Sequence, residues 1–324
     1  GMSGEGEIES LSVWAVDQDE GDTVWVQSSS YTRPPSLSVM DVTAGLKSPR
    51  TLLKSLPHQF DSAGLQARQF ETESTDGTKV PYFVISKQGL TTDGSTPTLV
   101  YAYGGFEVSL TPGYNPVVGV SWLEQGGCYV VANIRGGGEF GPDWHRAALR
   151  EKRQNAYDDL FAVCSQLIAD GITSPSKLGV RGGSNGGLLA GNALVQRSDL
   201  LGAVVGEVPL LDMKRFHKLL AGSSWIAEYG DPDTEDWEYL EQLSPYHRVD
   251  SEKTYSPVLF TTSTRDDRVH PGHARKMVKR LLATDTPTYY YENIEGGHGG
   301  AADNKQRAFM QALVYSFLWQ KLGS

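Results

Sequence analysis

The chain has 324 residues, 39% of them hydrophobic, which is enough for a sizeable core in one large domain or two modest ones. Its 29 Lys and Arg residues against 39 Asp and Glu residues give a net charge of -10, which disfavours a nucleic-acid or anionic-membrane partner. No run approaches the roughly 18 consecutive apolar residues of a membrane span.

The N-terminus and the cysteines carry no catalytic signal. A Gly before the first Met indicates an expression scar, so we predict that residues 1–7 are disordered and derived from a tag. Cys128 and Cys164 lie in apolar segments without C-x-x-C spacing, which favours buried thiols over a disulfide or a metal site. Unpaired thiols fit a reducing compartment, so we expect a cytoplasmic location, with a lost signal peptide or a periplasmic location left open.

Residues 8–60 differ in sequence pattern from the rest of the chain that follows them. They contain short β-type runs at close spacing, separated by Gly-Asp and Pro-Pro turns, at 11–16, 23–27 and 37–42. Such runs predict a small antiparallel sheet.

From residue 61 to residue 324 the pattern becomes that of an α/β domain. A hairpin signal comes first, at Asp76-Gly77 between two alternating segments, 66–75 and 78–86. Strand-like runs rich in β-branched or aromatic residues follow at 97–102, 128–134, 177–181, 202–208, 257–263 and 287–293. Apolar stripes at helical spacing fill the intervals: Tyr157, Leu160, Phe161, Cys164, Leu167 and Ile168; Met277, Leu281 and Leu282; Phe309, Leu313 and Phe317. The alternation predicts a mostly parallel sheet with helices on both faces.

The stretch Gly182-Gly183-Ser184-Asn185-Gly186-Gly187 joins a predicted strand to a predicted helix. Glycines on both sides of a serine permit a sharp turn that lifts the hydroxyl clear of the sheet and leaves room for a substrate. This G-x-S-x-G pattern predicts a nucleophile elbow with Ser184 as the nucleophile. For the motif alone, an ordinary Gly-rich strand-to-helix connection is the alternative.

A serine nucleophile needs a base that takes its proton and an acid that orients the base. Asp266 and His298 follow the last two predicted strands in that order. The order Ser, Asp, His is that of an α/β-hydrolase, which is the fold we predict. The Gly-rich loop 103–106, after the first strand of this half, suits one oxyanion donor, and the Asn185 N–H suits the other.

Three further motifs have weaker functional readings. Residues 136–141 fit G-x-G-x-x-G, but Pro142 follows at once and no acidic residue closes a short βαβ unit, so we predict no cofactor. His270 and His273 lack an evident third ligand, so we expect solvated histidines and no metal site. The acidic cluster within 231–238 is interpreted as a solvated helix start.

From about residue 70 to the C-terminus, the chain resembles the catalytic domain of the prolyl oligopeptidase family of serine peptidases. The stretches that carry the resemblance are Tyr103-Gly104-Gly105-Phe106, 132–139, 182–187, 225–230, Asp266-Asp267-Arg268-Val269 and Gly297-His298-Gly299. The resemblance implies hydrolysis of short proline-containing peptides on the C-terminal side of proline, through an acyl-enzyme. Within it, Ser184 would be the nucleophile, His298 the base and then the acid, and Asp266, rather than Asp267, the orienting acid.

The resemblance also implies an oxyanion hole and a proline pocket. The Tyr103 hydroxyl would bind the oxyanion beside the Asn185 N–H, and Arg268 would hold a substrate carbonyl one residue upstream of the proline. The pocket would be closed by Trp225, Phe106, Tyr229, Val269 and Leu210. A flat, compact ring gains from burial and stacking in such a pocket. For Trp225 alone, core packing is the alternative.

Two departures from the family pattern matter. Pro209 and Leu210 stand where family members usually have a glycine and a pocket-lining valine, so the size of the pocket stays open. Family members also carry a seven-bladed β-propeller ahead of this domain, and here only residues 8–60 resemble its last strands. We therefore expect the chain to be the C-terminal portion of a longer protein.

Two alternatives to post-proline cleavage follow from these departures. One is a related triad hydrolase of other specificity, such as oligopeptidase B or an acylaminoacyl peptidase, although Trp225 and Asn185 argue against both. The other is an inactive interaction module, because a hydrolase domain without its propeller lacks the outer part of its substrate site. The sequence does not define an oligomeric state.

Overall fold

The computed structural model describes residues 8–19, 21–43, 45 and 48–323. The predicted disorder of residues 1–7 lies outside the described residues. The chain divides into two compact units. The smaller comprises residues up to 68 with 85–88 and 111–126, and the larger comprises 69–84, 89–110 and 127–324.

The smaller unit contains a four-stranded sheet in the order β1-β2-β3-β4. Its strands are β1 (Glu9–Ala15), β2 (Thr23–Ser30), β3 (Ser36–Asp41) and β4 (Thr51–Ser55). Neighbouring strands are antiparallel throughout, which confirms the predicted all-β segment. The sequence did not predict β4, whose Leu52, Leu53 and Lys54 are not strong strand formers.

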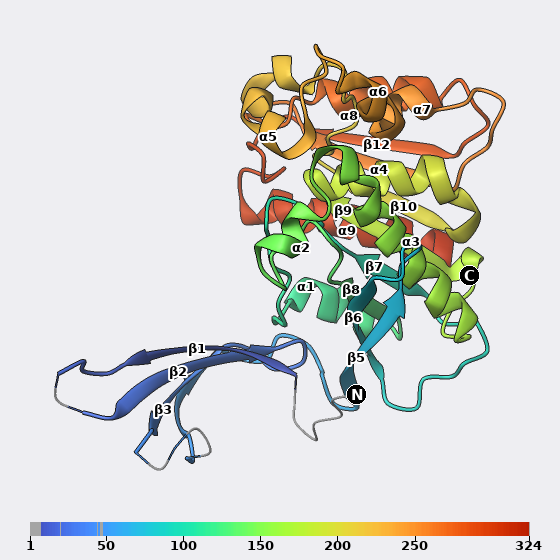
Figure 1. The fold of residues 1–324 in the computed structure, drawn as a ribbon. Coiled ribbons are helices and arrows are strands. Elements are labelled where there is room, and N and C mark those ends of the chain that lie inside the picture. The colour runs from blue at the N-terminus through green and yellow to red at the C-terminus, as the bar shows by residue number, and fades with distance from the viewer. Residues whose placement is uncertain (1–7, 20, 44, 46–47, 324) are drawn as a thin grey trace. The chain divides into compact units, whose positions relative to one another are not determined.

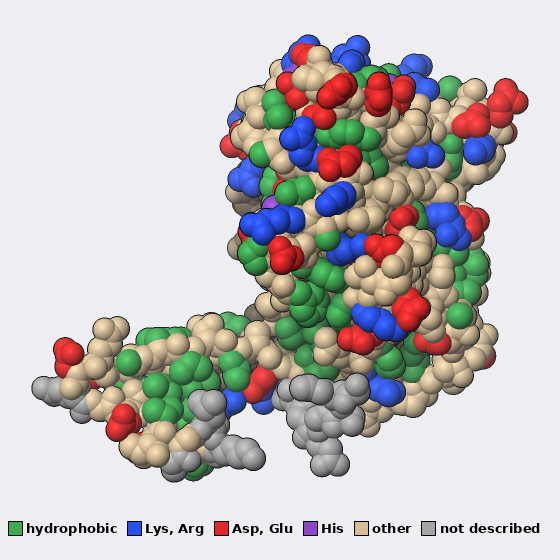
Figure 2. All heavy atoms as spheres, in the orientation of Figure 1, with side chains coloured by type: hydrophobic (Ala, Val, Ile, Leu, Met, Phe, Trp, Pro, Cys, Tyr) green, Lys and Arg blue, Asp and Glu red, His purple; other side chains and the backbone are tan. Residues whose placement is uncertain are grey.

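Apolar side chains are exposed on the smaller unit, and hydrophobic groups gather over β1 to β3 in Figure 2. The exposed groups on its two edge strands are Leu11, Val13, Trp14, Leu52 and Leu53. The first three of these residues lie on β1 and the last two on β4, at opposite edges of the sheet.

The second sheet has eight strands in the order β12-β11-β10-β9-β7-β8-β6-β5 (Figure 1). Its strands are β5 (Leu65–Glu73), β6 (Lys79–Lys87), β7 (Thr98–Tyr101), β8 (Cys128–Ala132), β9 (Leu178–Gly183), β10 (Ala203–Glu207), β11 (Val258–Ser263) and β12 (Thr288–Asn293). The ladder from β8 through β7, β9, β10 and β11 to β12 is parallel. Gly77, with φ 83°, closes the turn between β5 and β6, where the sequence predicted a hairpin.

The longer helices are α3 (Gln154–Ala169), α4 (Asn185–Arg197), α8 (Gly272–Leu281) and α9 (Asn304–Leu322). Shorter α-helices are α1 (Pro116–Val118), α2 (Pro142–Arg146), α5 (Ile226–Tyr229), α6 (Trp237–Leu240) and α7 (Pro245–Arg248). A π-helical turn, η1 (Gly119–Leu123), and 3₁₀ turns complete the chain: η2 (Arg150–Lys152), η3 (Pro175–Lys177), η4 (Ser198–Leu200), η5 (Phe216–Lys218), η6 (Leu220–Trp225) and η7 (Glu241–Leu243).

Side chains on β9 show that α4 and α9 cover opposite faces of the sheet. Arg181 points toward α9, where it donates to the Tyr315 hydroxyl at 2.9 Å and to Gln311 Oε1 at 2.7 Å. The next residue, Gly182, faces the other way, and a Cβ there would overlap the Gly186 carbonyl in α4. Helices on both faces of a largely parallel sheet confirm the predicted α/β-hydrolase architecture.

Helical periodicity located the helices better than their buried faces. Leu282 is 62% exposed just beyond α8, and Phe309 is 54% exposed in α9, although both belong to the apolar stripes named in the sequence analysis. The buried side of α9 is formed by Met310, Val314, Tyr315, Phe317, Leu318 and Leu322. Apolar residues lie around most of this helix, so their spacing does not single out one face.

Both cysteines are buried, as predicted. Burial raises the pKa of each thiol to about 12. Among the described residues, none of the helices combines the length and apolar character that a membrane crossing requires.

Candidate active site

Ser184 lies between β9 and α4 in a conformation that a non-glycine residue seldom adopts, with φ 57° and ψ -116°. Such a backbone costs on the order of 1–3 kcal/mol and persists only when its surroundings enforce it. The Ser184 N–H donates to the Glu207 carbonyl at 2.9 Å, and the Ser184 carbonyl accepts the Gly187 N–H at 2.9 Å. A Cβ at Gly187 would lie 2.6 Å from Pro209 Cα. Glycine at this position is therefore required by close packing against the neighbouring loop.

Asp266 and His298 come together at the ends of β11 and β12. The His298 Nδ1 lies 2.9 Å and 3.1 Å from the two Asp266 carboxylate oxygens. Asp266 Oδ1 also accepts the N–H groups of Arg268 and Val269, both at 2.9 Å. Asp267 instead accepts the backbone N–H of His298 at 3.2 Å. An ionised carboxylate only accepts, so this arrangement places the proton on Nδ1 and leaves Nε2 as the basic nitrogen.

Tyr103 and Asn185 lie beside Ser184. Burial raises the pKa of Tyr103, while a hydrogen bond with the Ser184 side chain acts in the opposite direction. The phenol therefore remains protonated and can donate. The backbone N–H of Asn185 is in the first turn of α4, where N–H groups have no partner within the helix. Asn185 Nδ2 donates to the Tyr103 carbonyl at 2.6 Å, which fixes the two residues relative to each other.

A cavity of about 220 Å³ opens at this point of the larger unit. It is lined by nine residues, all of them named by the sequence prediction: Tyr103, Phe106, Ser184, Asn185, Leu210, Trp225, Tyr229, Arg268 and Val269. Its volume is below the roughly 300–1,000 Å³ of pockets for drug-sized ligands, so it suits a compact group. None of the nine is acidic. The half-buried Trp225 both lines the cavity and packs against the core. A place in the pocket and a role in core packing are therefore compatible for this residue.

A second Gly-rich loop, which follows β8, supports the loop that carries Tyr103. The Gly136 carbonyl accepts the Glu107 N–H at 3.2 Å, and Gly136, with φ 94°, packs directly on the Gly104 carbonyl. The loop of residues 136–141, whose sequence fits the dinucleotide-binding pattern, therefore packs its backbone against the loop that carries Tyr103.

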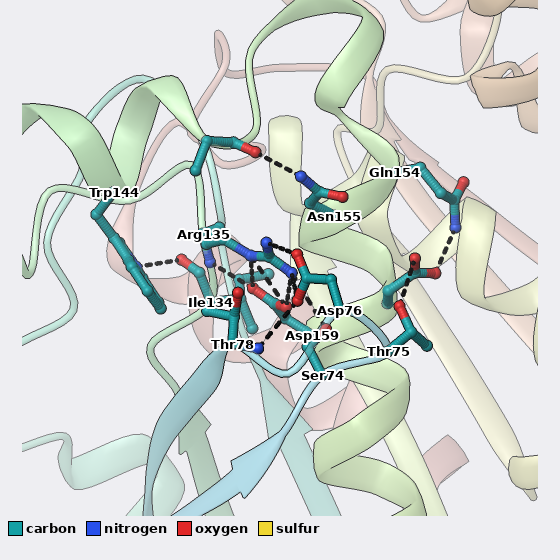
Figure 3. A network of polar contacts seen from close by, with 12 residues as sticks. Ser74, Thr75, Asp76, Thr78, Ile134, Arg135, Trp144, Gln154, Asn155 and Asp159 are labelled. Carbon is teal, nitrogen blue, oxygen red and sulfur yellow. Dashed lines mark hydrogen bonds and ion pairs between the residues drawn. The ribbon is translucent and has the colours of Figure 1, made fainter.

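Arg135, which directly precedes this loop, ties it to neighbouring elements through several hydrogen bonds (Figure 3). Its guanidinium donates to the buried Asp159 at 2.6 Å and to Asp76 at 2.5 Å, and its backbone N–H donates to Asp159 at 2.9 Å. Trp144 Nε1 donates to the Ile134 carbonyl at 3.0 Å on the other side. The β5–β6 turn, the end of β8 and α3 are thus joined through one guanidinium.

His273 is a correction to the sequence analysis, which expected a solvated side chain. It is buried, and its Nδ1 accepts the N–H groups of Leu211 at 3.3 Å and Asp212 at 3.0 Å. Burial lowers the pKa of His273 to about 4, so the ring is neutral near pH 7. It supports the loop that carries Leu210. The sequence could not show this because the two N–H donors come from a loop about sixty residues earlier.

One group of described residues presents potential cation ligands, namely His217, Asp231 and Asp233, whose ligand atoms lie within 4.8 Å of one another. The Lys218 ammonium already lies 2.8 Å from Asp233, which gives this carboxylate a counter-charge. We assign no metal role to this group.

Three ionisable residues beside the cavity were missed by the sequence analysis: His145, Arg153 and Glu228. The only signal for Glu228 is its position between Trp225 and Tyr229. A single Arg or Glu in a helical segment is usually solvated, so the sequence alone gives no reason to place these groups inside the protein.

The fold and the elbow define the class of protein: a hydrolase with the α/β-hydrolase fold. Residues 118–324 match the model of the prolyl oligopeptidase family. The chain belongs to the prolyl oligopeptidase family of serine peptidases, which confirms the predicted resemblance.

Individual relatives agree with this family. The chain is 49% identical over 317 residues to an uncharacterized peptidase of Sinorhizobium fredii, covering 98% of this chain and 43% of that protein. It is 35% identical over 300 residues to a prolyl endopeptidase of Elizabethkingia miricola, covering 91% and 42%. The solved structure of a post-proline cleaving enzyme from Rickettsia typhi is similar with a TM-score of 0.89 and 38% identity, covering 97% of this chain and 45% of that one. The chain thus spans less than half the length of these proteins.

Proposed function

We propose that this chain is the catalytic portion of a serine peptidase that hydrolyses short peptides on the C-terminal side of proline. The observation that carries the proposal is the cavity of about 220 Å³, which is lined by Ser184 together with Trp225 and Arg268. An indole and other apolar side chains around a small cavity favour a compact ring such as pyrrolidine. The names of the relatives from Elizabethkingia miricola and Rickettsia typhi support the same substrate class.

In the proposed mechanism, His298 Nε2 takes the proton of the Ser184 hydroxyl as Oγ attacks the carbonyl carbon of the proline residue. The oxygen of the tetrahedral intermediate becomes negative and accepts hydrogen bonds from the Tyr103 hydroxyl and the Asn185 N–H. The imidazolium, oriented by the ionised Asp266, then gives its proton to the leaving amine, and the C–N bond breaks. Water, deprotonated by the same imidazole, releases the acyl group and regenerates the serine.

Arg268 is proposed to bind the substrate carbonyl one residue upstream of the proline. A guanidinium at this position also argues against a second candidate function, cleavage after Arg or Lys. A cationic substrate side chain would need an acidic partner to offset its desolvation, and none of the nine described residues that line the cavity is acidic.

Replacement of Ser184 tests the proposal directly. Ser184→Ala should reduce turnover of a Gly-Pro reporter by orders of magnitude, to the ~10³–10⁴-fold residual acceleration that binding and oxyanion contacts provide. Ser251→Ala, which alters an exposed serine, is the matched control and should keep full turnover. Unchanged turnover in Ser184→Ala would refute the assignment.

The alternative of an inactive interaction module has its own test. A fluorophosphonate should label the wild-type chain at Ser184, because labelling requires an activated serine hydroxyl but does not require a propeller domain. A well-folded chain that is not labelled would favour the module.

We further propose that β1 to β4 belong to the last part of a β-propeller in a longer parent protein. Propeller blades are four-stranded sheets, and this sheet has four antiparallel strands with exposed apolar side chains. We also propose a cytoplasmic location, because the two cysteines are buried and lack C-x-x-C spacing.

A further inference from the structure

We propose that Glu228 is a positioning residue that couples the wall of the proline pocket to the residue after the nucleophile. The inference rests on the proposed function, because it concerns how the same cavity selects proline. Glu228 does not line the cavity itself. It acts through the residues that do.

The Glu228 carboxylate lies at the centre of three polar contacts. It is buried, with its side chain 6% exposed. One oxygen accepts the backbone N–H of Phe106 at 2.9 Å and a guanidinium N–H of Arg153 at 3.1 Å. The other oxygen lies 2.8 Å from His145 Nε2. These partners come from the loop after β7, from the start of α3 and from α2.

The contact with Phe106 holds a strained piece of backbone. Phe106 and Glu107 have φ values of 54° and 56°, a region that bulky residues avoid at a cost on the order of 1–3 kcal/mol each. Glu228 accepts the N–H of the first, and the Gly136 carbonyl accepts the N–H of the second. Without the carboxylate, the Phe106 N–H would lose its acceptor and the strained turn would be free to relax. The Phe106 ring, which forms one pocket wall, would move with it.

The contact with Arg153 reaches the other side of the cavity. Arg153 is buried, and it donates to Asn185 Oδ1 and to the Ala148 carbonyl, the latter at 3.2 Å. Its guanidinium lies 5.1 Å from the centre of the Tyr229 ring. The Tyr229 hydroxyl also donates to Asn185 Oδ1, at 2.7 Å. The carboxylate therefore holds a guanidinium that orients a pocket residue and the residue after the nucleophile.

These contacts give Glu228 two separable effects. Loss of the Phe106 contact should impair recognition of the proline ring, and loss of the Arg153 contact should disturb the Asn185 side of the oxyanion hole. Glu228→Gln keeps an oxygen that accepts both hydrogen bonds but removes the charge. Glu228→Ala removes the oxygen as well. A role in positioning therefore predicts graded losses, larger for Ala than for Gln.

The experiment compares Gly-Pro and Gly-Ala reporters with the same leaving group. For Glu228→Ala we expect kcat/KM for Gly-Pro to fall roughly 10- to 100-fold, the range set by one lost hydrogen bond to a charged carboxylate and relaxed strain. The preference for proline over alanine should fall with it. Glu228→Gln should retain most of that preference. Glu235→Ala, at an exposed site seven positions further along the chain, is the control.

The outcomes separate this inference from the proposed function. A wild-type chain without a preference for Gly-Pro would refute the proposed function, and this inference with it. A wild-type preference that folded Glu228→Ala retains would overturn the inference alone. If Glu228→Ala does not fold, the double variant Arg153→Met with Glu228→Met removes both buried charges, an exchange that is often tolerated. Loss of the proline preference in that double variant would support the inference. A proline preference as large as that of the wild-type chain would overturn it.

Discussion

Replacement of Arg135 with Met should destabilise the larger unit much more than the loss of a surface charge. The Arg135 side chain is 4% exposed, and Asp159, with which it pairs at 2.6 Å, is fully buried. Met keeps the length of the stem and the backbone N–H that donates to Asp159, but removes the guanidinium. Asp159 would then be a buried carboxylate without a counter-charge, which costs about 3–5 kcal/mol.

This magnitude can be measured by urea unfolding at pH 7, followed by tryptophan fluorescence. For a unit of this size, about 3–5 kcal/mol corresponds to a fall in Tm of about 6–20 °C. Arg146→Met is the matched control, because that side chain is 69% exposed and its partner Asp143 is 97% exposed, and its effect should stay within about 0.5 kcal/mol. The double variant Arg135→Met with Asp159→Asn should recover part of the loss. A free energy of unfolding for Arg135→Met within about 1 kcal/mol of the wild type would refute this reasoning.

The same variant has a signature in acid. The hydrogen bond from Arg135 lowers the pKa of Asp76 from its ordinary 3.8 to about 2. A lowered pKa in the folded state means that this contribution is present above pH 3.8 and is lost as the pH falls toward 2. The Asp76 side chain is 46% exposed, so solvent screening keeps the contribution small. In Arg135→Met, the free energy of unfolding should therefore fall less steeply between pH 4 and pH 2 than in the wild type. An equal slope in both would show that the Arg135–Asp76 contact does not contribute to stability.

Three further predictions concern the site. Tyr103→Phe should lower kcat for a Gly-Pro reporter by ~10²–10³ with little change in KM, because the lost O–H acts on the transition state; an unchanged kcat would remove Tyr103 from the oxyanion hole. Trp225→Ala should lower kcat/KM for Gly-Pro about 10- to 100-fold through lost burial and stacking, and an equal loss for Gly-Ala would show that the indole does not recognise proline. His273→Asn keeps an acceptor for the Leu211 and Asp212 N–H groups but does not titrate. Because the pKa of His273 in the folded state, about 4, lies below the ordinary 6.5, the stability of the wild type should fall as the pH drops from 6.5 to 4. The urea midpoint of the variant should change less with pH over this range.

The sequence was sufficient to name the candidate site residues that lie at the ends of strands. Ser184, Asp266 and His298 each follow a strand, and in a parallel sheet the strand ends meet at one edge. Glycine spacing also predicted the elbow. The structure adds that Ser184 itself takes the strained backbone, whereas Gly182 and Gly187 are required by packing against Gly186 and Pro209.

The residues that the sequence did not predict are those defined by contacts between distant segments. Glu228 meets the Phe106 N–H across 122 positions, and His273 accepts from a loop 61 and 62 positions away. Neither contact leaves a local pattern, because periodicity and turn chemistry report only on neighbours within a few residues. The exposed Phe309 has a related cause, since the buried face of an evenly apolar helix is chosen by the element packed against it.

Cleavage of a defined peptide tests the central claim most directly. A short synthetic peptide with one proline, one arginine and one alanine at interior positions would be incubated with the wild-type chain and with Ser184→Ala, and the fragments identified by mass spectrometry. We expect wild-type fragments that end in proline and an intact peptide with the variant. Fragments that end in arginine or alanine, or cleavage after proline that survives in Ser184→Ala, would contradict the account.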